Sequence, residues 1–291
     1  MMAPLDYGST GSRPPYTYVT TVYGGSRISD MLEATNSMLA QTCSPSEVVI
    51  VIDGPIPAEV DEGVERMRTL VSNECAARVQ RLERNVGPGL AGQCGIDLAS
   101  HELVARLDSD DLALPERIER EMAVFAEHPE LCSVGTWVRE FDDSGRGRPS
   151  VVELPETPGQ ISAYARRRCP CRQSSLLYRK SAILAVGGYR SLRIAEEWDL
   201  YNRLIKAGYR CWNIPEPLVL MRTDPSYFAR RGGASYARDI LAFKWGMLRR
   251  RETDPLSFAV SAGSSLVASL VPNSVRSALY RNLLRRGEDR A

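Results

Sequence analysis

The stretch ARLDSDDLALPERIE, residues 105–119, joins the end of an apolar run to three aspartates, Asp108, Asp110 and Asp111. Alternate residues of an extended chain point to the same side, so Asp108 and Asp110 can face one ligand. Magnesium is often held by one or two carboxylates together with substrate phosphates, which would relieve the repulsion among these side chains. The stretch therefore predicts a strand that ends at a metal and diphosphate site. A solvated turn that caps the next helix is the alternative interpretation.

Strands and helices are expected to alternate through the first half of the chain. The run EVVIVIDGP (47–55) is rich in β-branched residues, which is typical of a strand buried on both faces, and it ends at Asp53. Further strands are predicted within 16–25, 77–83 and 102–108, and helices within 28–42, 61–75, 85–99 and after Pro115. Such alternation predicts an α/β fold with a parallel sheet covered by helices. Ligands of these sheets bind beyond the carboxyl ends of the strands, so Asp53 and the 108–111 aspartates should face one crevice.

The second half has a mixed pattern. We predict a strand over 132–141, and then a strand, a short helix and a Gly-Gly turn over 174–189. The segment 196–209 is typical of a helix with an acidic first turn. Two short strands, RCWNIP (210–215) and LVLMR (218–222), should precede a helical region that begins after about residue 233. Near the N-terminus, Asp30 followed by Glu33 resembles a capping box for the first helix.

The charge balance excludes a nucleic-acid-binding protein. The chain of 291 residues has a formal net charge of +1 and therefore no global basic field. Basic residues nevertheless gather in the second half, within 165–169, 229–233, 247–252 and 281–290. Each of these runs is either a solvated face or a contact with phosphates or anionic lipid.

Cysteine usage and the chain ends indicate a cytoplasmic protein. The seven cysteines include no pair of CxxC units, so we expect reduced thiols and no zinc site. Residues 1–15 are rich in Pro, Gly and Ser and lack an apolar core, which predicts a loose tail and not a signal peptide. No run of about 18 apolar residues predicts a membrane-spanning helix.

Several segments in a fixed order resemble a family 2 inverting glycosyltransferase with a GT-A fold. They are TTVYGGS, LEATNSMLAQT, EVVIVIDGP, NVGPGLAGQCGI, ARLDSDDLALPERIE, LLYRKSAILAVGGYR, EEWDLYNRLIKAGY and NIPEPLVLMR. The resemblance extends over about residues 17–233, and the end of this range is similar to a subgroup that builds bacterial exopolysaccharides, the amylovoran type among them. It implies a Rossmann-like, mixed but mostly parallel sheet flanked by helices.

The resemblance also implies a division of the chain. After the tail, a GT-A catalytic domain would occupy residues 16–233. Its nucleotide-binding half would be residues 16–112 and its acceptor half residues 113–233. A helical C-terminal extension would occupy residues 234–291. The extension could lie on anionic lipid as a peripheral membrane contact through its basic helices, or it could be a scaffold that packs on the domain.

The resemblance further implies roles for individual residues. Thr21 and Tyr23 match positions that flank the nucleotide base, and Asp53 matches an aspartate that hydrogen-bonds uracil. Asp110 would bind Mg²⁺ or Mn²⁺, Asp108 the ribose or the metal, and Asp111 would orient the sugar or support the residues around it. Glu197 falls where the family carries the catalytic aspartate of a Glu-Asp pair. The segment that folds over the diphosphate would contribute Arg222, Arg230 and Arg231.

Three departures from the family pattern affect these roles. The pair is Glu196-Glu197, and the extra methylene moves the carboxylate by about an ångström, a shift that can lower a rate by about two orders of magnitude. Glu197 can still serve as the catalytic carboxylate if the pocket is set back. Otherwise Asp199 gains importance. The alternative interpretation is that these are ordinary acidic residues at the start of a helix. Gln173 and Ser174 replace a His-Pro pair, and Gly92 and Gln93 replace Leu-Asn, so acceptor and donor contacts should differ.

The implied function is metal-dependent transfer from a nucleotide-sugar, with a UDP-sugar favoured, to a glycan or polyprenyl-linked glycan acceptor in bacterial polysaccharide biosynthesis. A carboxylate would remove the proton of the acceptor hydroxyl, and the anomeric configuration would invert in one displacement. The alternative is a catalytically weak member that acts as a non-catalytic subunit of a glycan-assembly complex. A sugar nucleotidyltransferase is a further alternative, but VYGGSR (22–27) matches its Gly-rich loop only in part.

Overall fold

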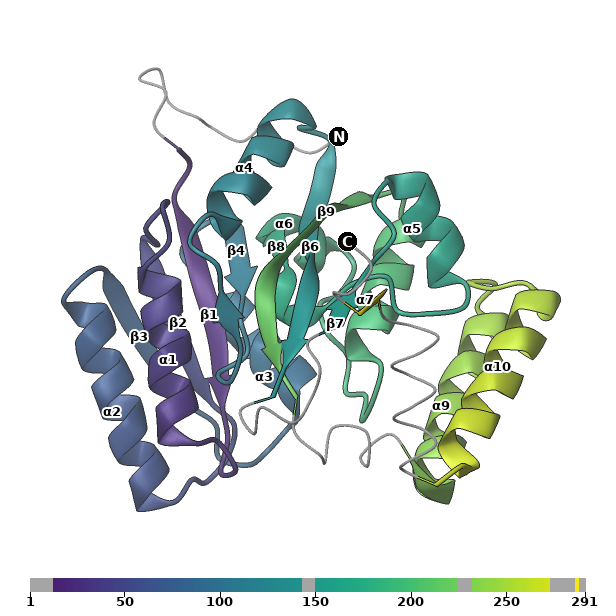
Figure 1. The fold of residues 1–291 in the computed structure, drawn as a ribbon, viewed down its shortest axis with the longest axis horizontal. Coiled ribbons are helices and arrows are strands. Elements are labelled where there is room, and N and C mark those ends of the chain that lie inside the picture. The colour runs from purple at the N-terminus through teal and green to yellow at the C-terminus, as the bar shows by residue number, and fades with distance from the viewer. Residues whose placement is uncertain (1–12, 143–149, 224–231, 273–285, 288–291) are drawn as a thin grey trace.

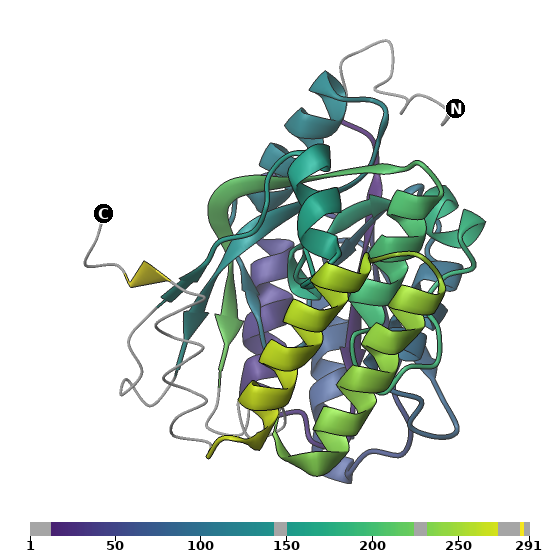
Figure 2. The ribbon, with the colours of Figure 1, turned by 90° about the vertical axis from the view of Figure 1, so that its right-hand side faces the viewer.

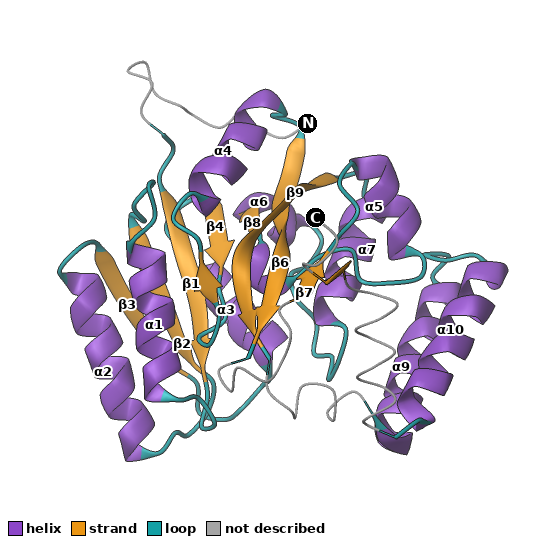
Figure 3. Ribbon diagram, viewed as in Figure 1, coloured by secondary structure: helices purple, strands orange, loops and turns teal. Residues whose placement is uncertain are grey.

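The computed structural model describes residues 13–142, 150–223, 232–272 and 286–287. The described residues form one mixed sheet covered by helices, with a separate helical pair at the C-terminal side (Figures 1 and 3). The strands are β1 (Tyr16–Val22), β2 (Glu47–Ile52), β3 (Ala76–Arg81), β4 (Leu103–Arg106), β5 (Leu112–Ala113), β6 (Leu131–Phe141), β7 (Ser150–Val152), β8 (Leu177–Arg179), β9 (Arg210–Arg222) and β10 (Arg286–Gly287). The helices are α1 (Ile28–Leu39), α2 (Ala58–Ser72), α3 (Pro88–Leu98), α4 (Arg117–Glu127), α5 (Pro158–Ala165), α6 (Lys180–Ala185), α7 (Glu196–Lys206), α9 (Gly233–Arg249) and α10 (Pro255–Leu270), with a 3-10 turn, η1, at Gln173–Ser175.

The N-terminal half is a parallel sheet in the order β3-β2-β1-β4. Every residue of β2 is buried, because its alternate side chains enter two different cores. Val48, Ile50 and Ile52 pack in the core that α1, α2 and α4 cover, whereas Val49 and Val51 pack on the α3 and α7 side. The β-branched run of the sequence is therefore explained by helices on both faces.

The second half of the chain extends the sheet beyond β4, mainly with antiparallel strands. Strand β8 lies between β4 and β6 and is antiparallel to both. Strand β9 is parallel to β6 and antiparallel to β5, the two-residue strand that follows the aspartate cluster. The β5–β9 pairing brings Leu220 opposite Leu112, so the end of β9 reaches the aspartates.

Helices α9 and α10 pack side by side as a hairpin (Figure 2). A small apolar cluster attaches the hairpin to the main body: Ile240, Phe243 and Met247 of α9 surround Trp198 of α7. Within the part of the chain that the structure describes, no helix is long and apolar enough to cross a membrane.

The predicted GT-A-type α/β fold is confirmed, as are the alternation of strands and helices and the helical C-terminal region. Two local predictions were wrong. The two short strands within 210–222 are one strand, β9, whose pairing with β6 shifts register near Thr136 and Trp137. Asp30 is not the N-cap of α1, because the helix begins at Ile28 and Asp30 lies in its first turn. There its carboxylate accepts a 2.7 Å hydrogen bond from Arg27 Nε.

Candidate functional site

The candidate site lies where β1, β2 and β4 end. Because these neighbouring strands are parallel, the segments that follow them leave the sheet at the same edge. The Asp53 amide donates to Val22 O (2.7 Å) and the Leu107 amide to Val19 O (3.3 Å), so the loops after the strands begin close together. The sheet thus brings Tyr23, Asp53 and the 108–111 aspartates to one edge, although Asp108 lies 85 positions after Tyr23 in the sequence.

Asp53 is buried and holds the loop that precedes α3. Its two carboxylate oxygens accept from the Val86 amide (2.7 Å) and the Gly87 amide (3.0 Å). Gly87 adopts a φ of +89°, a backbone conformation that a side chain would strain. A carboxylate has about four acceptor sites, so Asp53 keeps the capacity to accept a further donor such as a base N–H.

Tyr23 offers an exposed aromatic surface at the end of β1. Its side chain is 52% exposed, and its ring lies over Gly25, where an added Cβ would come within 2.6 Å of the ring. Thr21, two residues earlier, is half-buried in the strand. An exposed ring beside a carboxylate is suited to stack against a base while the carboxylate accepts its N–H.

Asp108 and Asp111 are held in place by the turn at η1. The Asp108 amide donates to Ser174 Oγ (3.1 Å), and Gln173 Nε2 donates to Asp108 Oδ1 (3.3 Å). Asp111 is buried, and its carboxylate accepts from the Arg222 amide at 2.8 Å. Burial, together with the charges of Asp110 and Asp108, raises the pKa of Asp111 well above its usual range.

Asp110 lies at the mouth of the site with its side chain exposed. Desolvation by the surrounding protein and the neighbouring charge of Asp108 raise the pKa of Asp110 to about 6. The two carboxylates therefore destabilise each other when both are ionised, and a cation between them would remove this repulsion.

This donor set fits a divalent cation that keeps ligands from its substrate. Among the described residues there is no group of three or more His, Cys, Asp or Glu side chains that could hold a metal by itself. Two carboxylate ligands, Asp108 and Asp110, are the number that magnesium commonly takes from protein when phosphates supply the rest. The crowded charge of the pair is the observation that favours a cation here.

Arg222 is in the site, but its guanidinium is already engaged. Its Nε donates to Asp110 O (3.0 Å), and its Nη2 lies 2.8 Å from the Glu33 carboxylate. The guanidinium also lies over the Phe141 ring, 4.7 Å from the ring centroid. Arg222 is thus fixed beside the aspartates. Arg230 and Arg231 lie outside the described residues.

The Glu196-Glu197 pair opens α7 and faces the end of α3. A Cβ at Gly89, in the first turn of α3, would come within 3.1 Å of Glu196 Cβ. Burial raises the pKa of Glu197 well above its usual range, and the charges of Glu196, Cys169 and Asp108 raise it further. The electrostatic influence of Asp108 on Glu197 indicates that the α7 carboxylate and the aspartate loop belong to one site.

Asp199 has a different environment. Its buried carboxylate lies 2.8 Å from Arg203 Nε, 3.5 Å from Arg250 Nη2 and 3.7 Å from Arg190 Nη1. The Asp199 carboxylate is therefore committed to ion pairs within the fold and is not free to contact an acceptor. This geometry favours Glu197 over Asp199 as the base.

Sequence reasoning missed Arg106. This residue of β4 is fully buried, its Nη2 lies 3.6 Å from Asp108 Oδ1, and none of its three guanidinium nitrogens has a hydrogen-bond partner among the described residues. Gly92 makes room for it, since a Cβ there would come within 2.7 Å of Arg106 Nη1. The signal was an arginine inside the apolar strand ELVARLD.

Comparison with known proteins gives a consistent result. Residues 18–186 match the family model described as "Glycosyl transferase family 2". The amylovoran biosynthesis glycosyltransferase AmsE of Erwinia amylovora is 29% identical over 77% of this chain and 82% of its own length. The UDP-Gal:alpha-D-GlcNAc-diphosphoundecaprenol beta-1,3-galactosyltransferase of Escherichia coli is 26% identical over 94% of this chain and 98% of its own length.

Solved structures share the fold. The mannosyltransferase PcManGT from Pyrobaculum calidifontis, in complex with GDP-Man and Mn²⁺, has a TM-score of 0.63 at 15% identity and covers 91% of this chain and 79% of its own. Residues 1–349 of TarS from S. aureus, in complex with UDP-GlcNAc, have a TM-score of 0.59 at 19% identity over 80% of this chain. The chain spans 66% of that TarS structure, just under two thirds.

Proposed function

Because the chain belongs to glycosyl transferase family 2, we propose that it transfers a sugar from a nucleoside diphosphate donor to a glycan or polyprenyl-linked glycan acceptor. A UDP-sugar is the favoured donor, with Mg²⁺ or Mn²⁺ as the cofactor. The observation that carries the proposal is the convergence of three groups at one edge of the sheet. These groups are Asp53 with the Tyr23 ring, the 108–111 aspartates, and Glu197, whose pKa responds to the charge of Asp108.

The donor would lie across the ends of β1, β2 and β4. Tyr23 would stack on the base with Thr21 beside it, and Asp53 would accept the base N–H. Asp108 and Asp110 would hold the cation and the diphosphate, and Asp111 would orient the loop through its bond to the Arg222 amide. A divalent cation bound there would neutralise charge on the departing diphosphate. Arg230 and Arg231 remain proposed contacts to the diphosphate.

Glu197 would act as the general base. Its carboxylate would take the proton of the acceptor hydroxyl while that oxygen attacks the anomeric carbon and the nucleoside diphosphate leaves from the opposite face. A base works best with a pKa near the working pH, and a half-buried glutamate with a raised pKa approaches that condition. Glu196 would support Glu197 by its adjacent charge.

The relatives support an acceptor in bacterial polysaccharide assembly. The name of the E. coli relative specifies an acceptor sugar linked to diphosphoundecaprenol, and that relative covers 94% of this chain. We propose an acceptor of this class and a cytoplasmic location, with the C-terminal helices in peripheral contact with the membrane. Residues 16–112 would serve as the nucleotide-binding half, residues 113–233 as the acceptor half and residues 234–291 as the extension.

A non-catalytic role is the second candidate, because the Glu196-Glu197 pair departs from the Glu-Asp pattern of the family. Under that proposal the chain would bind a donor without turning it over. Detection of sugar transfer or of donor hydrolysis by the purified protein would decide between the two.

The test is isothermal titration of the protein with UDP, GDP, CDP and dTDP, each with and without Mn²⁺. We expect UDP to bind in the presence of Mn²⁺ and Asp110→Ala to abolish this binding. Glu62→Ala, which removes an exposed carboxylate on α2, serves as the matched control and should bind UDP like the wild type. If no nucleotide binds under any condition, the aspartates form only a turn before α4 and the proposed function is wrong.

A further inference from the structure

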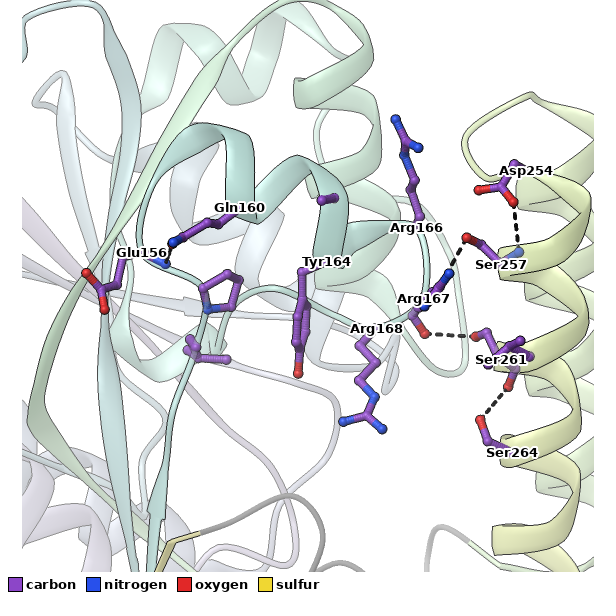
Figure 4. A pocket seen from close by; sticks show the side chains of 14 residues that line it. Glu156, Gln160, Tyr164, Arg166, Arg167, Arg168, Asp254, Ser257, Ser261 and Ser264 are labelled. Atoms are coloured by element: carbon purple, nitrogen blue, oxygen red, sulfur yellow. Dashed lines mark hydrogen bonds between the residues drawn. The ribbon is translucent and has the colours of Figure 1, made fainter. Parts of the chain in front are cut away.

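A second cavity lies apart from the aspartates, between the end of α5 and helix α10. Its volume is about 890 Å³ (Figure 4). Arg167 joins its two walls, because its Nε donates to Ser257 Oγ (3.1 Å) and its carbonyl oxygen accepts from Ser261 Oγ (2.8 Å). The cavity therefore depends on contacts between the catalytic domain and the C-terminal hairpin.

One wall of the cavity carries three arginines, Arg166, Arg167 and Arg168, and the positive charge of Arg166 acts on the Asp254 carboxylate. Arg168 points the same way as Tyr164 from the end of α5 (Figure 4), and no hydrogen bond or ion pair holds its guanidinium within the described ranges. Of the two acids that line the cavity, Asp254 accepts from the Ser257 amide as the cap of α10, and Glu156 lies on the side away from α10 (Figure 4).

Lys244 adds a buried ammonium behind the same wall. Its Nζ bonds only to neutral oxygens, Ser261 O (2.7 Å), Ser261 Oγ and Ser265 Oγ (2.6 Å), and no carboxylate of the described chain lies within ion-pair distance. Burial, together with the positive charge of Arg168, lowers the pKa of Lys244 to about 8. The region thus has an excess of positive charge that an anion would relieve.

An exposed apolar stripe begins at this cavity. Val260, which lines the cavity, is 52% exposed, and Leu256, Val267 and Leu270 are each about 60–70% exposed. Spacings of four, seven and three residues place these side chains on one face of α10. Cations beside an apolar stripe match a ligand with a charged head and a hydrocarbon chain, whereas a free nucleotide would leave the stripe without a contact.

The cavity is connected to the catalytic helix. Trp198, the residue after Glu197, donates from Nε1 to Ala165 O (2.6 Å) at the end of α5. Cys169 directly follows Arg168, and its charge raises the pKa of Glu197. The segment that carries Arg168 is therefore bonded at one end to α7, the helix of the proposed base.

We propose that this cavity binds the diphosphate of a polyprenyl diphosphate-linked acceptor, with the hydrocarbon chain along the α10 stripe. The inference rests on the proposed function, since it identifies where the acceptor of that reaction is held. Arg168 supplies the charge that recognises the diphosphate, and Val260 marks where the chain leaves the cavity toward a lipid surface.

The test uses full-length protein and farnesyl diphosphate as a soluble probe, titrated in EDTA so that metal-dependent binding at the aspartates does not contribute. Inorganic diphosphate is titrated in parallel as the headgroup alone. We expect farnesyl diphosphate to bind about tenfold or more tightly than inorganic diphosphate, because each buried methylene adds affinity. Arg168→Ala should weaken farnesyl diphosphate binding about tenfold, the effect of losing a charge-assisted hydrogen bond.

Two further variants separate the parts of the proposal. Val260→Ser, which adds no charge, should weaken farnesyl diphosphate and leave inorganic diphosphate unchanged, and Arg66→Ala, which removes an exposed arginine on α2, should change neither. Equal affinities for the two probes would overturn the lipid assignment, and affinities unchanged in Arg168→Ala would overturn the site. If Val260→Ser dissociates a dimer in sedimentation and leaves lipid binding intact, the stripe is a protein interface.

Titration of the same samples with UDP and Mn²⁺ distinguishes this inference from the proposed function. Normal UDP binding without farnesyl diphosphate binding would overturn the acceptor site alone. If the wild-type protein bound neither UDP nor farnesyl diphosphate, the proposed function would be overturned as well.

Discussion

Arg106 is a charged residue in an environment that strongly disfavours charge. Its guanidinium is fully buried, lacks hydrogen-bond partners among the described residues, and has Asp108 at 3.6 Å as its nearest acid. A buried charge that is poorly paired lowers the stability of a fold, and such groups are concentrated at functional sites. We therefore infer that Arg106 positions Asp108 and offsets the negative charge of the aspartate loop.

Arg106→Met should weaken metal-dependent UDP binding about tenfold without loss of stability, because a similar-sized apolar side chain removes the uncompensated charge from the core. Titration with UDP and Mn²⁺ measures the first effect and urea unfolding the second. Arg106→Lys, which keeps the charge, should recover part of the affinity. A variant that loses stability and retains UDP affinity would show that Arg106 serves the fold alone.

Glu197→Gln should abolish transfer and leave donor binding intact, because the amide cannot accept the acceptor proton. Glu197→Asp should lower kcat by about a hundredfold, since the shorter side chain withdraws the carboxylate by about an ångström from a site built around glutamate. An increase in kcat for Glu197→Asp would instead show that the glutamate at this position lowers the activity of the chain relative to the aspartate of the family pattern.

The pH profile gives a separate measure of the same residue. A base is active only when deprotonated, and the pKa of Glu197 is raised by burial and by Glu196, Cys169 and Asp108. The rate should therefore increase as the pH rises through a pKa well above the ordinary glutamate value of about 4.3. A kcat/KM profile with no acidic limb above that value would contradict the assignment.

Sequence reasoning located Asp53 and the 108–111 aspartates at strand ends because their runs of apolar residues are continuous and β-branched. The structure brings them to one edge, as predicted. The sequence could not reveal that Gln173 donates to Asp108. The two residues lie 65 positions apart and are brought together by the antiparallel pairing of β8 with β4. The engagement of Arg222 by Glu33, 189 positions away, was hidden for the same reason.

At the scale of elements, α3 packs against the sheet through glycine. A Cβ at Gly95 would come within 2.3 Å of Val19 Cγ1 and 3.3 Å of Val51 Cγ2, so the helix contacts β1 and β2 almost at backbone distance. This close approach positions the loop that Asp53 holds and the first turn that faces Glu196.

Gly95→Ala should lower the free energy of unfolding by about 1–3 kcal/mol, because the added methyl forces α3 away from the sheet. Gly263 in α10 is the matched control, since a Cβ there would meet none of the described residues within 4 Å. Gly263→Ala should be neutral or raise the free energy of unfolding by about 0.5–1 kcal/mol through helix propensity alone. Urea denaturation of both variants measures the contrast, and equal effects would contradict it.

Long periodic elements were predicted well, and elements that depend on distant partners were not. Strand β5 has only two residues, and its existence depends on pairing with β9, more than one hundred positions away. The two strands predicted within 210–222 form one because β6 offers a continuous partner despite the prolines in that stretch. Arg27 competes for the Asp30 carboxylate, which explains why the predicted capping box does not form.

At the scale of the whole molecule, Asp199 couples α7 to the C-terminal hairpin. It lies on α7 two residues after Glu197, and it contacts Arg203 of the same helix and Arg250 at the end of α9. Arg250 in turn pairs with Glu252 at 2.8 Å, and Trp198 packs against Phe243 of α9. The hairpin is thus attached to the element that carries the proposed base, a connection that helical periodicity after residue 233 did not reveal.

Asp199→Asn should lower the free energy of unfolding by about 3 kcal/mol, because it leaves the buried Arg203 guanidinium without its carboxylate. The kcat of the folded fraction should remain within a fewfold of the wild type, in contrast to Glu197→Gln, which should lose kcat with its unfolding midpoint unchanged. Thermal unfolding measures the stability of each variant, and active-site titration gives the kcat of its folded fraction. Together they separate a structural role from a catalytic one. If Asp199→Asn keeps full stability and loses its turnover, Asp199 is the base and the hairpin is coupled to α7 by apolar packing alone.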